Sequence, residues 1–208
     1  MPFRIALAAL PLLLAAAPAF AHHPMGGAVP ETFMHGLLSG IGHPVIGIDH
    51  FAFVVAVGLA AAFMRNVWAP PLAAVVGMGA GCLLAVGAVA LPMVEPVIAL
   101  SAMLLGGMVL FGRSIPVPAA AALFAFAGLF HGAAYGEAVI GAEPTPVVAY
   151  LVGLAAVQMA IALASAALVR GGWKAGSAAA LQPRLAGAVC AGIGLAFTVE
   201  ALEGALLG

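Results

Sequence analysis

Two segments of the sequence combine histidine with carboxylate in a pattern that could bind a metal ion. They are residues 43–50, HPVIGIDH, and residues 130–137, FHGAAYGE. Imidazole nitrogen together with carboxylate oxygen suits borderline divalent ions such as Ni²⁺, Co²⁺, Zn²⁺ or Fe²⁺, whereas Mg²⁺ and Ca²⁺ prefer sites made almost wholly of oxygen. With one further acid near the C-terminus, the predicted metal ligands are His43, Asp49, His50, His131, Glu137 and Glu200.

The spacing within each motif predicts which side chains share a helix face. His43 and His50 are seven residues apart, so a regular helix would align them to within about 20°. His43 precedes a proline, which disfavours helical backbone, and we expect it at the lip of the helix. His131 and Tyr135 are i, i+4 neighbours on one face, with Tyr135 either a site residue or an interfacial aromatic anchor. Glu137 would point about 120° away from His131 in an unbroken helix. Either the helix opens at a glycine, or Glu137 binds the ion at a different depth along its path.

The elements that must position these residues are membrane helices. The chain has 208 residues, of which 65% are hydrophobic and only 6% are charged, whereas a soluble domain carries roughly 25% charged residues. Soluble, disordered and fibrous classes are therefore excluded, and a net charge of −1 leaves no basic face for nucleic acid. Cys82 and Cys190 lie in apolar stretches and predict neither a disulfide nor a thiolate metal site.

Apolar runs punctuated by proline, glycine and charge predict an all-α, polytopic bundle of six transmembrane helices. A shorter stretch, 31–41, is expected to form a half-helix on the outer face, separated from the first span by Gly40, Gly42 and Pro44. Small-residue faces such as 77–81 permit close helix contacts within or between protomers, so the sequence leaves the oligomeric state open. The six expected spans are 44–64, 70–91, 95–113, 118–140, 146–169 and 183–207.

The N-terminus has the pattern of a cleavable secretory signal peptide. Arg4 supplies a basic start, 5–17 an apolar run, and 19–21 an A-x-A cleavage site. The sequence therefore predicts three parts of the chain: a signal peptide (1–21), a periplasmic segment that contains the half-helix (22–43), and a six-helix transmembrane domain (44–208). His22, His23 and His35 are then candidates for outer capture of an ion.

The charged residues predict an orientation. With the N-terminus outside, each Lys and Arg falls on the cytoplasmic side, as the positive-inside rule requires. All seven acids and all six histidines fall on the outer side or in the outer half. They predict an electronegative funnel that opens outward, although the roles of Glu95 and Glu143 stay open. The basic residues that follow spans one, three and five are Arg65, Arg113, Arg170, Lys174 and Arg184.

HPVIGIDH, FHGAAYGE and the following IGAEPTP resemble the HupE/UreJ family of secondary nickel/cobalt permeases, and the resemblance covers the layout of the whole mature chain. Many members have F-H-G-x-A-H-G-x-E, so this chain has Tyr135 in place of a second histidine, and its acid, Glu137, stands one place earlier. The resemblance implies a metal-path role for His43, Asp49 and His50 and, in the second motif, for His131 and Glu137. We expect a multi-pass protein of the bacterial inner membrane, and the distribution of Lys and Arg places both termini in the periplasm.

The energy source and the function class follow from what the chain lacks and from the membrane potential. A G-x-x-x-x-G-K-[ST] loop is absent, so we expect no ATP hydrolysis, no enzyme activity and no resident cofactor. The partners are lipid and the transported ion, with no ATPase subunit evident. A divalent cation entering the cell gains roughly 4.6 kcal/mol per 100 mV. We therefore expect a secondary permease that imports nickel or cobalt.

Two expectations and several alternatives complete this reading. Uptake should fall below about pH 6, because imidazole must be neutral to ligate, and the exit should be lined by small residues and backbone carbonyls. Import of copper, iron or zinc stays open, as does a haem-binding electron-transfer protein that uses a pair such as His50 and His131. A membrane metalloenzyme is disfavoured because H-E-x-x-H is absent. Channel-like passage, alternating access and proton coupling are not distinguished.

Overall fold

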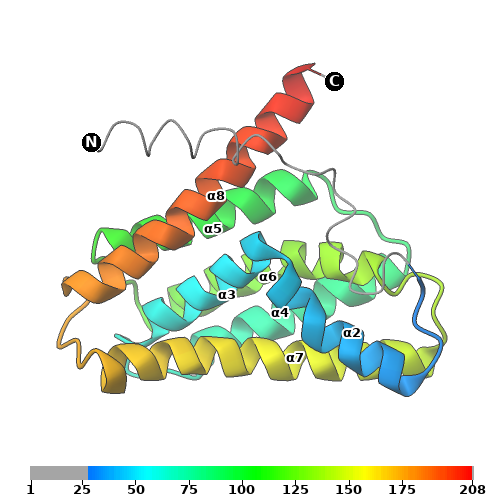
Figure 1. The fold of residues 1–208 in the computed structure, drawn as a ribbon, viewed down its shortest axis with the longest axis horizontal. Helices are drawn as coiled ribbons and strands as arrows, with labels where there is room; N and C mark the ends of the chain where they lie inside the picture. The colour runs from blue at the N-terminus through cyan, green and yellow to red at the C-terminus, as the bar shows by residue number, and fades with distance from the viewer. Residues whose placement is uncertain (1–27, 208) are drawn as a thin grey trace, which may run out of the picture.

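The protein is a bundle of helices. The computed structural model describes residues 28–207. All regular secondary structure in that range is helical, which confirms the predicted all-α class. The signal peptide predicted over 1–21, with His22 and His23, lies outside the described residues. The helices, shown in Figure 1, are α2 (Phe33–Ile46), α3 (Ile48–Ala61), α4 (Ala69–Val86), α5 (Val94–Leu110), α6 (Val117–Glu137), α7 (Pro144–Ala167), the π-helical turn η2 (Leu168–Gly172) and α8 (Leu181–Leu207).

Helix length and hydropathy identify a multi-pass membrane protein. Four helical stretches are long and apolar enough to cross a bilayer: α4, α6, α7 with η2, and α8. The pair α2 and α3 meets the same test only as one bent span, which makes five. The helix α5 is apolar but has 17 residues, about 26 Å at the usual rise, against a hydrocarbon core of about 30 Å. Six crossings therefore stay a prediction.

The first expected span is broken, and the break is not where the sequence placed it. Helix α2 continues through Gly40, Gly42 and Pro44, and the chain turns at Gly47, where the axes of α2 and α3 differ by 81°. The expected boundary at 40–44 is therefore wrong. Pro44 lies in the last turn of α2, where its missing N–H removes only one helical hydrogen bond. The helix can therefore accommodate this proline close to its C-terminal end. Gly47 has extended backbone (φ −75°, ψ 101°) and starts the new direction.

Three helix pairs hold the bundle through glycine: α4 with α6, α5 with α8, and α2 with α7. A Cβ at Gly81 of α4 would collide with the backbone of Leu129 and Ala133 in α6, and one at Gly132 of α6 would collide with the backbone of Met78. Without a hydrophobic drive between helices in lipid, such close backbone approach supplies the van der Waals contact that joins them. The predicted small-residue face at 77–81 is thus used within the chain, between α4 and α6.

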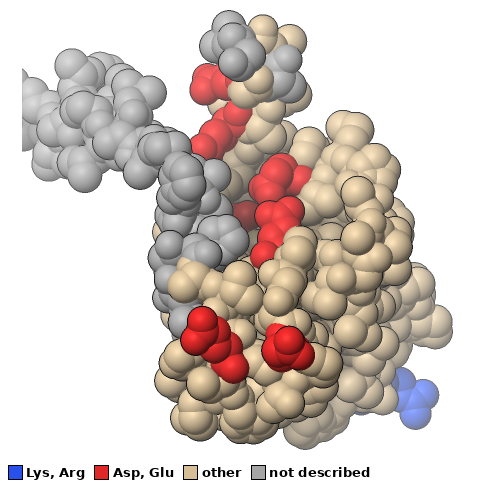
Figure 2. All heavy atoms as spheres, turned by 90° about the vertical axis from the view of Figure 1, so that its right-hand side faces the viewer, with Lys and Arg blue, Asp and Glu red and all other residues tan. Residues whose placement is uncertain are grey.

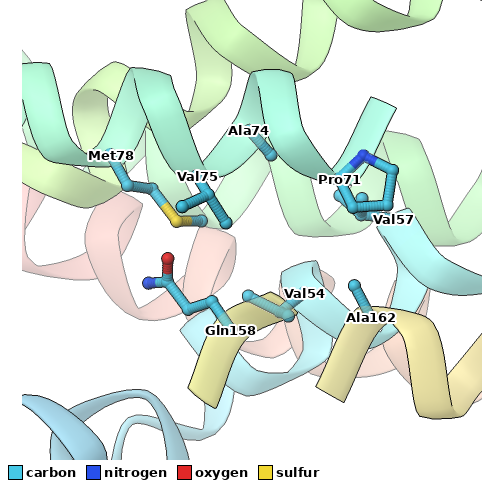
Figure 3. A pocket seen from close by; sticks show the side chains of 8 residues that line it. All are labelled: Val54, Val57, Pro71, Ala74, Val75, Met78, Gln158 and Ala162. Carbon is cyan, nitrogen blue, oxygen red and sulfur yellow. The ribbon is translucent and has the colours of Figure 1, made fainter. Parts of the chain in front are cut away.

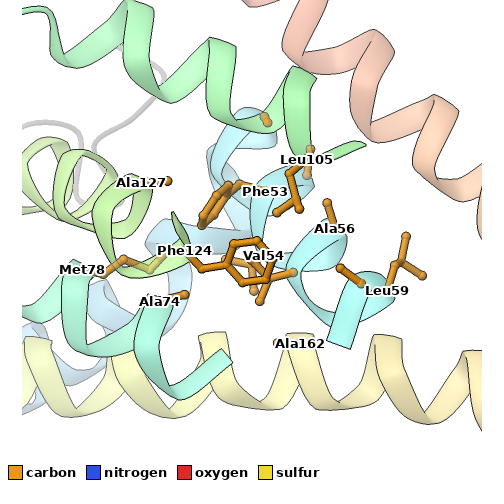
Figure 4. Packing of buried hydrophobic residues seen from close by; sticks show 14 of the residues in the cluster. Phe53, Val54, Ala56, Leu59, Ala74, Met78, Leu105, Phe124, Ala127 and Ala162 are labelled. Atoms are coloured by element: carbon orange, nitrogen blue, oxygen red, sulfur yellow. The ribbon is translucent and has the colours of Figure 1, made fainter. Parts of the chain in front are cut away.

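The apolar core lies where α3 crosses the other helices. Phe53 and Val54 of α3 meet Phe124 of α6 near the centre of Figure 4. By contrast, many large apolar side chains are exposed, among them Leu104 and Leu185. An outer surface of this kind suits contact with lipid chains.

The two ends of the bundle differ in charge. The six glutamates are exposed, and they stand at or near the helix ends at the right of Figure 1. Figure 2 views that end and shows the acidic side chains spread across it. We call it the acidic end. The other end carries the Lys and Arg residues that follow α3, α5 and α7, and we call it the basic end. This distribution matches the predicted separation of acids from bases.

Arginines at the basic end cap neighbouring helices. Arg170 donates from Nε to the carbonyl of Ala62 at 2.6 Å and from Nη2 to that of Met64 at 2.9 Å, where α3 ends. Arg184 donates from Nε to the carbonyl of Leu110 at 2.8 Å, at the end of α5. Each guanidinium satisfies carbonyls that a helix C-terminus leaves without internal partners, and its charge complements the helix dipole.

Candidate metal-binding cluster at the helix break

Polar side chains from five helices, all of them buried except the half-buried Ser101, meet around the break between α2 and α3. This polar cluster contains both predicted motifs, and its histidines and Asp49 are each no more than 3% exposed. Burial of so many polar groups in an otherwise apolar bundle marks a functional site, because ionisable groups are costly within a membrane. Its members are His43 of α2, Asp49 and His50 of α3, Ser101 of α5, His131 and Tyr135 of α6, and Tyr150 of α7.

The break itself brings the first motif together. His43 lies in the last turn of α2 and His50 in the first turn of α3, with ring centroids 6.4 Å apart across the bend. A Cβ at Gly47 would stand 2.8 Å from Cδ2 of His50, so glycine both turns the chain and makes room for the imidazole. His43 is helical and buried rather than at a lip, and the straight-helix alignment expected for the two histidines is replaced by this bend.

Asp49 is held at the start of α3. One of its carboxylate oxygens, Oδ1, accepts the backbone N–H of His50 at 2.8 Å. A helix N-terminus carries a partial positive charge and unsatisfied N–H groups, which favour an anion there. The bend therefore creates, inside the protein, a helix N-terminus at which a buried carboxylate can stay beside His50.

A chain of hydrogen bonds fixes the tautomer of His50. The Ser101 hydroxyl donates its single proton to the carbonyl of Ile98 at 2.8 Å, so at 2.9 Å it accepts from Nε2–H of His131. Nδ1 of neutral His131 is then an acceptor, and Nδ1–H of His50 donates to it at 2.7 Å. His50 consequently carries its lone pair on Nε2. His131 uses both ring nitrogens in these bonds and stacks on Phe53 with centroids 4.1 Å apart.

A second chain fixes His43 in the same way. The Tyr150 hydroxyl donates to the carbonyl of Tyr135 at 2.8 Å, so it accepts Nδ1–H of His43 at 2.7 Å. His43 therefore also carries its lone pair on Nε2. The Tyr135 ring packs against both histidines from one side, with its centroid 4.9 Å from that of His43 and 4.4 Å from that of His50. Hydrogen bonding of one imidazole nitrogen to orient the other is the usual arrangement around protein metal ligands.

This arrangement offers nitrogen and oxygen donors without being a closed cage. Metal–imidazole bonds are about 2.0–2.1 Å long, so two rings that share an ion have centroids about 5–6 Å apart, slightly closer than the 6.4 Å between His43 and His50. Among residues 28–207, no group of three or more His, Cys, Asp or Glu side chains is already arranged to hold a metal ion.

Other predicted ligands lie apart from the polar cluster. Glu137 is exposed at the end of α6, where it lines an open hollow of about 230 Å³ at the acidic end. Glu200 is exposed on α8, and His35 is exposed in the first turn of α2. Glu95 and Glu143 are exposed at the starts of α5 and α7. The structure thus brings together His43, Asp49, His50 and His131 but not the two glutamates.

Three polar residues near or in the polar cluster were not singled out from the sequence. Ser101 and Tyr150 orient the histidines, and Gln158 is buried on α7 next to Tyr135. The sequence signal that could have identified these three residues is a hydroxyl or amide side chain inside an otherwise apolar run. Gln158 is the only glutamine within an expected span, and Ser101 and Tyr150 interrupt similar runs.

Comparison with known proteins supports these observations. A family model described as "HupE / UreJ protein" matches residues 10–197. The "Protein HupE" of Rhizobium leguminosarum bv. viciae is 40% identical over 123 residues, which are 58% of this chain and 62% of that protein. The alignment thus spans under two thirds of the relative's length, and no solved structure matches. Because the family model covers nearly the whole chain, including both motifs, this protein belongs to the HupE/UreJ family.

Proposed function

We propose that this protein is an inner-membrane secondary permease that imports a divalent transition-metal cation, nickel or cobalt, through a path that opens to the periplasm. One observation carries the proposal. His43 and His50, whose ring lone pairs are fixed on Nε2 by separate hydrogen-bond chains, lie on either side of a helix break, and the buried Asp49 carboxylate stands in the first turn after the break. Broken helices with inward-facing ends are a recurring way to build ion sites in transporters.

The charge distribution supports the direction of transport. By the positive-inside rule the basic end faces the cytoplasm, and the exposed glutamates then face the periplasm. Carboxylates there concentrate cations at the mouth, and Glu137 in its hollow lies on the way in. The membrane potential then drives a divalent ion inward by roughly 4.6 kcal/mol per 100 mV.

The donor set supports a borderline metal as the substrate. Two neutral imidazoles and one carboxylate suit Ni²⁺ and Co²⁺ better than Mg²⁺ or Ca²⁺. His131 acts in this proposal as a positioning residue, because both of its nitrogens are occupied by His50 and Ser101. A haem held between His50 and His131 is disfavoured, since two rings bonded directly to each other at 2.7 Å cannot also flank a haem.

The test is ion uptake into proteoliposomes that contain the purified protein, with Ni²⁺, Co²⁺, Zn²⁺, Fe²⁺, Cu⁺ and Mg²⁺ offered separately. We expect uptake of Ni²⁺ or Co²⁺, and a fall of roughly 100-fold or more in Asp49→Asn and His50→Ala, since loss of outer-shell partners alone costs 10–100-fold. Lys174→Asn removes an exposed charge at the basic end and is expected to leave the rate within about twofold.

Each other outcome has a defined meaning. Full uptake by both site variants would disprove the path through the polar cluster. Metal binding by the wild-type protein without uptake of any ion would indicate a sensor or assembly role instead. Preferred uptake of zinc, iron or copper would keep the path and change the substrate.

A further inference from the structure

A small chamber lies between the polar cluster and the basic end. It is lined by α3, α4 and α7 and has about 10 Å³ of space for the centre of a water-sized molecule, enough for about one water. Figure 3 shows Met78 and Gln158 facing each other at one side, with Pro71 near the start of α4 at the other. Since α4 begins at the basic end, the chamber extends from the middle of the bundle in that direction.

Gln158 is the only polar side chain that lines this chamber, and within the part of the chain that the structure describes it makes no hydrogen bond of ordinary geometry. It is 1% exposed, and neither its Nε2 nor its Oε1 is bonded. A buried amide without partners costs roughly 1–3 kcal/mol, whereas leucine of similar size would fit the apolar walls at no such cost. A buried polar side chain that lowers the stability of the folded protein is expected mainly at functional positions.

The amide is connected to the polar cluster through Tyr135. The Tyr135 hydroxyl is also buried and makes no hydrogen bond of ordinary geometry within residues 28–207, but the Gln158 amide is close enough to act on it as a hydrogen-bonding group, and the charge of Asp49 reaches it as well. Side chains lean toward the N-terminus of their own helix, and α6 and α7 run in opposite directions (Figure 1). Tyr135 therefore leans toward the basic end and Gln158 toward the acidic end, so the two groups approach each other.

We propose that Gln158, with the Tyr135 hydroxyl and the Met78 sulfur, forms an uncharged inner station at which the divalent cation rests after it leaves the histidines and Asp49. This inference rests on the proposed function and adds the inward half of the path. The station replaces the earlier expectation of an exit lined only by small residues and backbone carbonyls.

The chemistry of the station suits release. An amide oxygen, a phenol oxygen and a thioether sulfur are neutral ligands, and a thioether binds softer transition ions rather than Mg²⁺ or Ca²⁺. Conduction requires a site that is favourable enough to enter and weak enough to leave. A neutral station next to a carboxylate–imidazole site provides a second, weaker step in the inward direction.

The experiment compares Gln158→Leu with Gln182→Leu, which makes the same change at an exposed position of α8. Three quantities are measured on purified protein: Ni²⁺ uptake into proteoliposomes, the Kd for Ni²⁺ in detergent, and the Tm. For Gln158→Leu we expect uptake to fall at least tenfold while the Kd stays within twofold of wild type and the Tm is unchanged or higher. Gln182→Leu should leave all three within twofold or within error.

A second variant keeps the test decisive if Gln158→Leu does not fold. Gln158→Asn keeps the amide but withdraws it from Tyr135 by one methylene, and we expect a smaller but clear loss of uptake. Uptake within twofold of wild type in every folded variant, with a raised Tm, would show that the chamber holds only a water molecule and would overturn the station alone. Absence of uptake by the wild-type protein would overturn both this inference and the proposed function.

Discussion

The glycine-packed helix pairs and the polar cluster hold helices together in different ways. In α4 and α6, Gly81 and Gly132 bring backbone against backbone, and the contact needs no particular side chain. In the polar cluster, α3, α5 and α6 are linked by three side chains in series: His50, His131 and Ser101. The glycine contacts tolerate no larger side chain at those positions. The polar cluster tolerates no loss of a hydrogen-bond donor or acceptor.

This difference separates the helix framework from the polar cluster. Backbone contacts between paired helices fix where α6 and α7 stand, and the hydrogen bonds of the polar cluster then determine which ring nitrogens of His43 and His50 carry a lone pair. We expect variants of the framework to act on stability and variants of the polar cluster to act on binding.

The largest effect is expected from Gly81→Leu. Its side chain would enter the backbone of α6, which cannot yield as a flexible side chain would, and overpacking of this kind costs 1–3 kcal/mol or more. Gly79→Leu is the matched control, because nothing lies within 4 Å of a Cβ at Gly79. Yield and thermal unfolding in detergent would show little folded Gly81→Leu and normal Gly79→Leu. Equal Tm values for the two would mean that α4 and α6 do not pack as described.

Ser101→Ala should weaken metal binding by roughly 10–100-fold, the cost that loss of outer-shell support for a ligating histidine has elsewhere. Without the hydroxyl, Nε2–H of His131 loses its acceptor, and His50 loses the orientation that places its lone pair on Nε2. The control is Ser165→Ala, because Ser165 donates only to the carbonyl of Ile161, at 2.8 Å. Calorimetric titration with Ni²⁺ measures the Kd of both variants. Similar Kd values would show that the hydrogen-bond chain from Ser101 through His131 to His50 does not affect metal binding.

The sequence allowed much of the framework and half of the site to be predicted. Hydropathy and breakers located the helices, and the positions of Lys and Arg separated the two ends. The histidine motifs were enough to predict that His43, Asp49, His50 and His131 converge. These features depend on local composition, which the sequence displays directly.

What could not be predicted depends on contacts between distant segments. The break was expected before Pro44, because proline is the stronger local signal, but it lies at Gly47, where the His50 ring needs the space of a missing Cβ. Tyr150 bonds to a histidine 107 positions away, and no local pattern shows this. Glu200 was expected among the metal ligands, but α8 packs against α5 and leaves that acid exposed.

The two tyrosines of the polar cluster should respond differently to loss of the hydroxyl. Tyr150→Phe removes the acceptor of His43 Nδ1–H, and we expect the Kd for Ni²⁺ to rise about tenfold, at the lower end of such effects. Tyr135→Phe keeps the ring that packs against both histidines and removes a hydroxyl that makes no hydrogen bond of ordinary geometry within residues 28–207, so it should slow uptake more than it weakens binding. Parallel titration and uptake would separate the two, and equal changes in Kd would contradict distinct roles.

The smallest effect concerns the arginine caps at the basic end. Arg170→Gln removes two hydrogen bonds to carbonyls at the end of α3 from a partly buried side chain, and we expect a loss of about 1 kcal/mol in stability, the usual net value for such bonds. Arg184→Gln removes one bond from an exposed side chain, where water can replace the donor, so its Tm should fall less. Neither residue touches the polar cluster, so the Kd for Ni²⁺ should stay unchanged in both. A cap variant that altered the Kd without lowering the Tm would show that the end of α3 is coupled to His50 at its start, and the separation of framework from site would then fail along that helix.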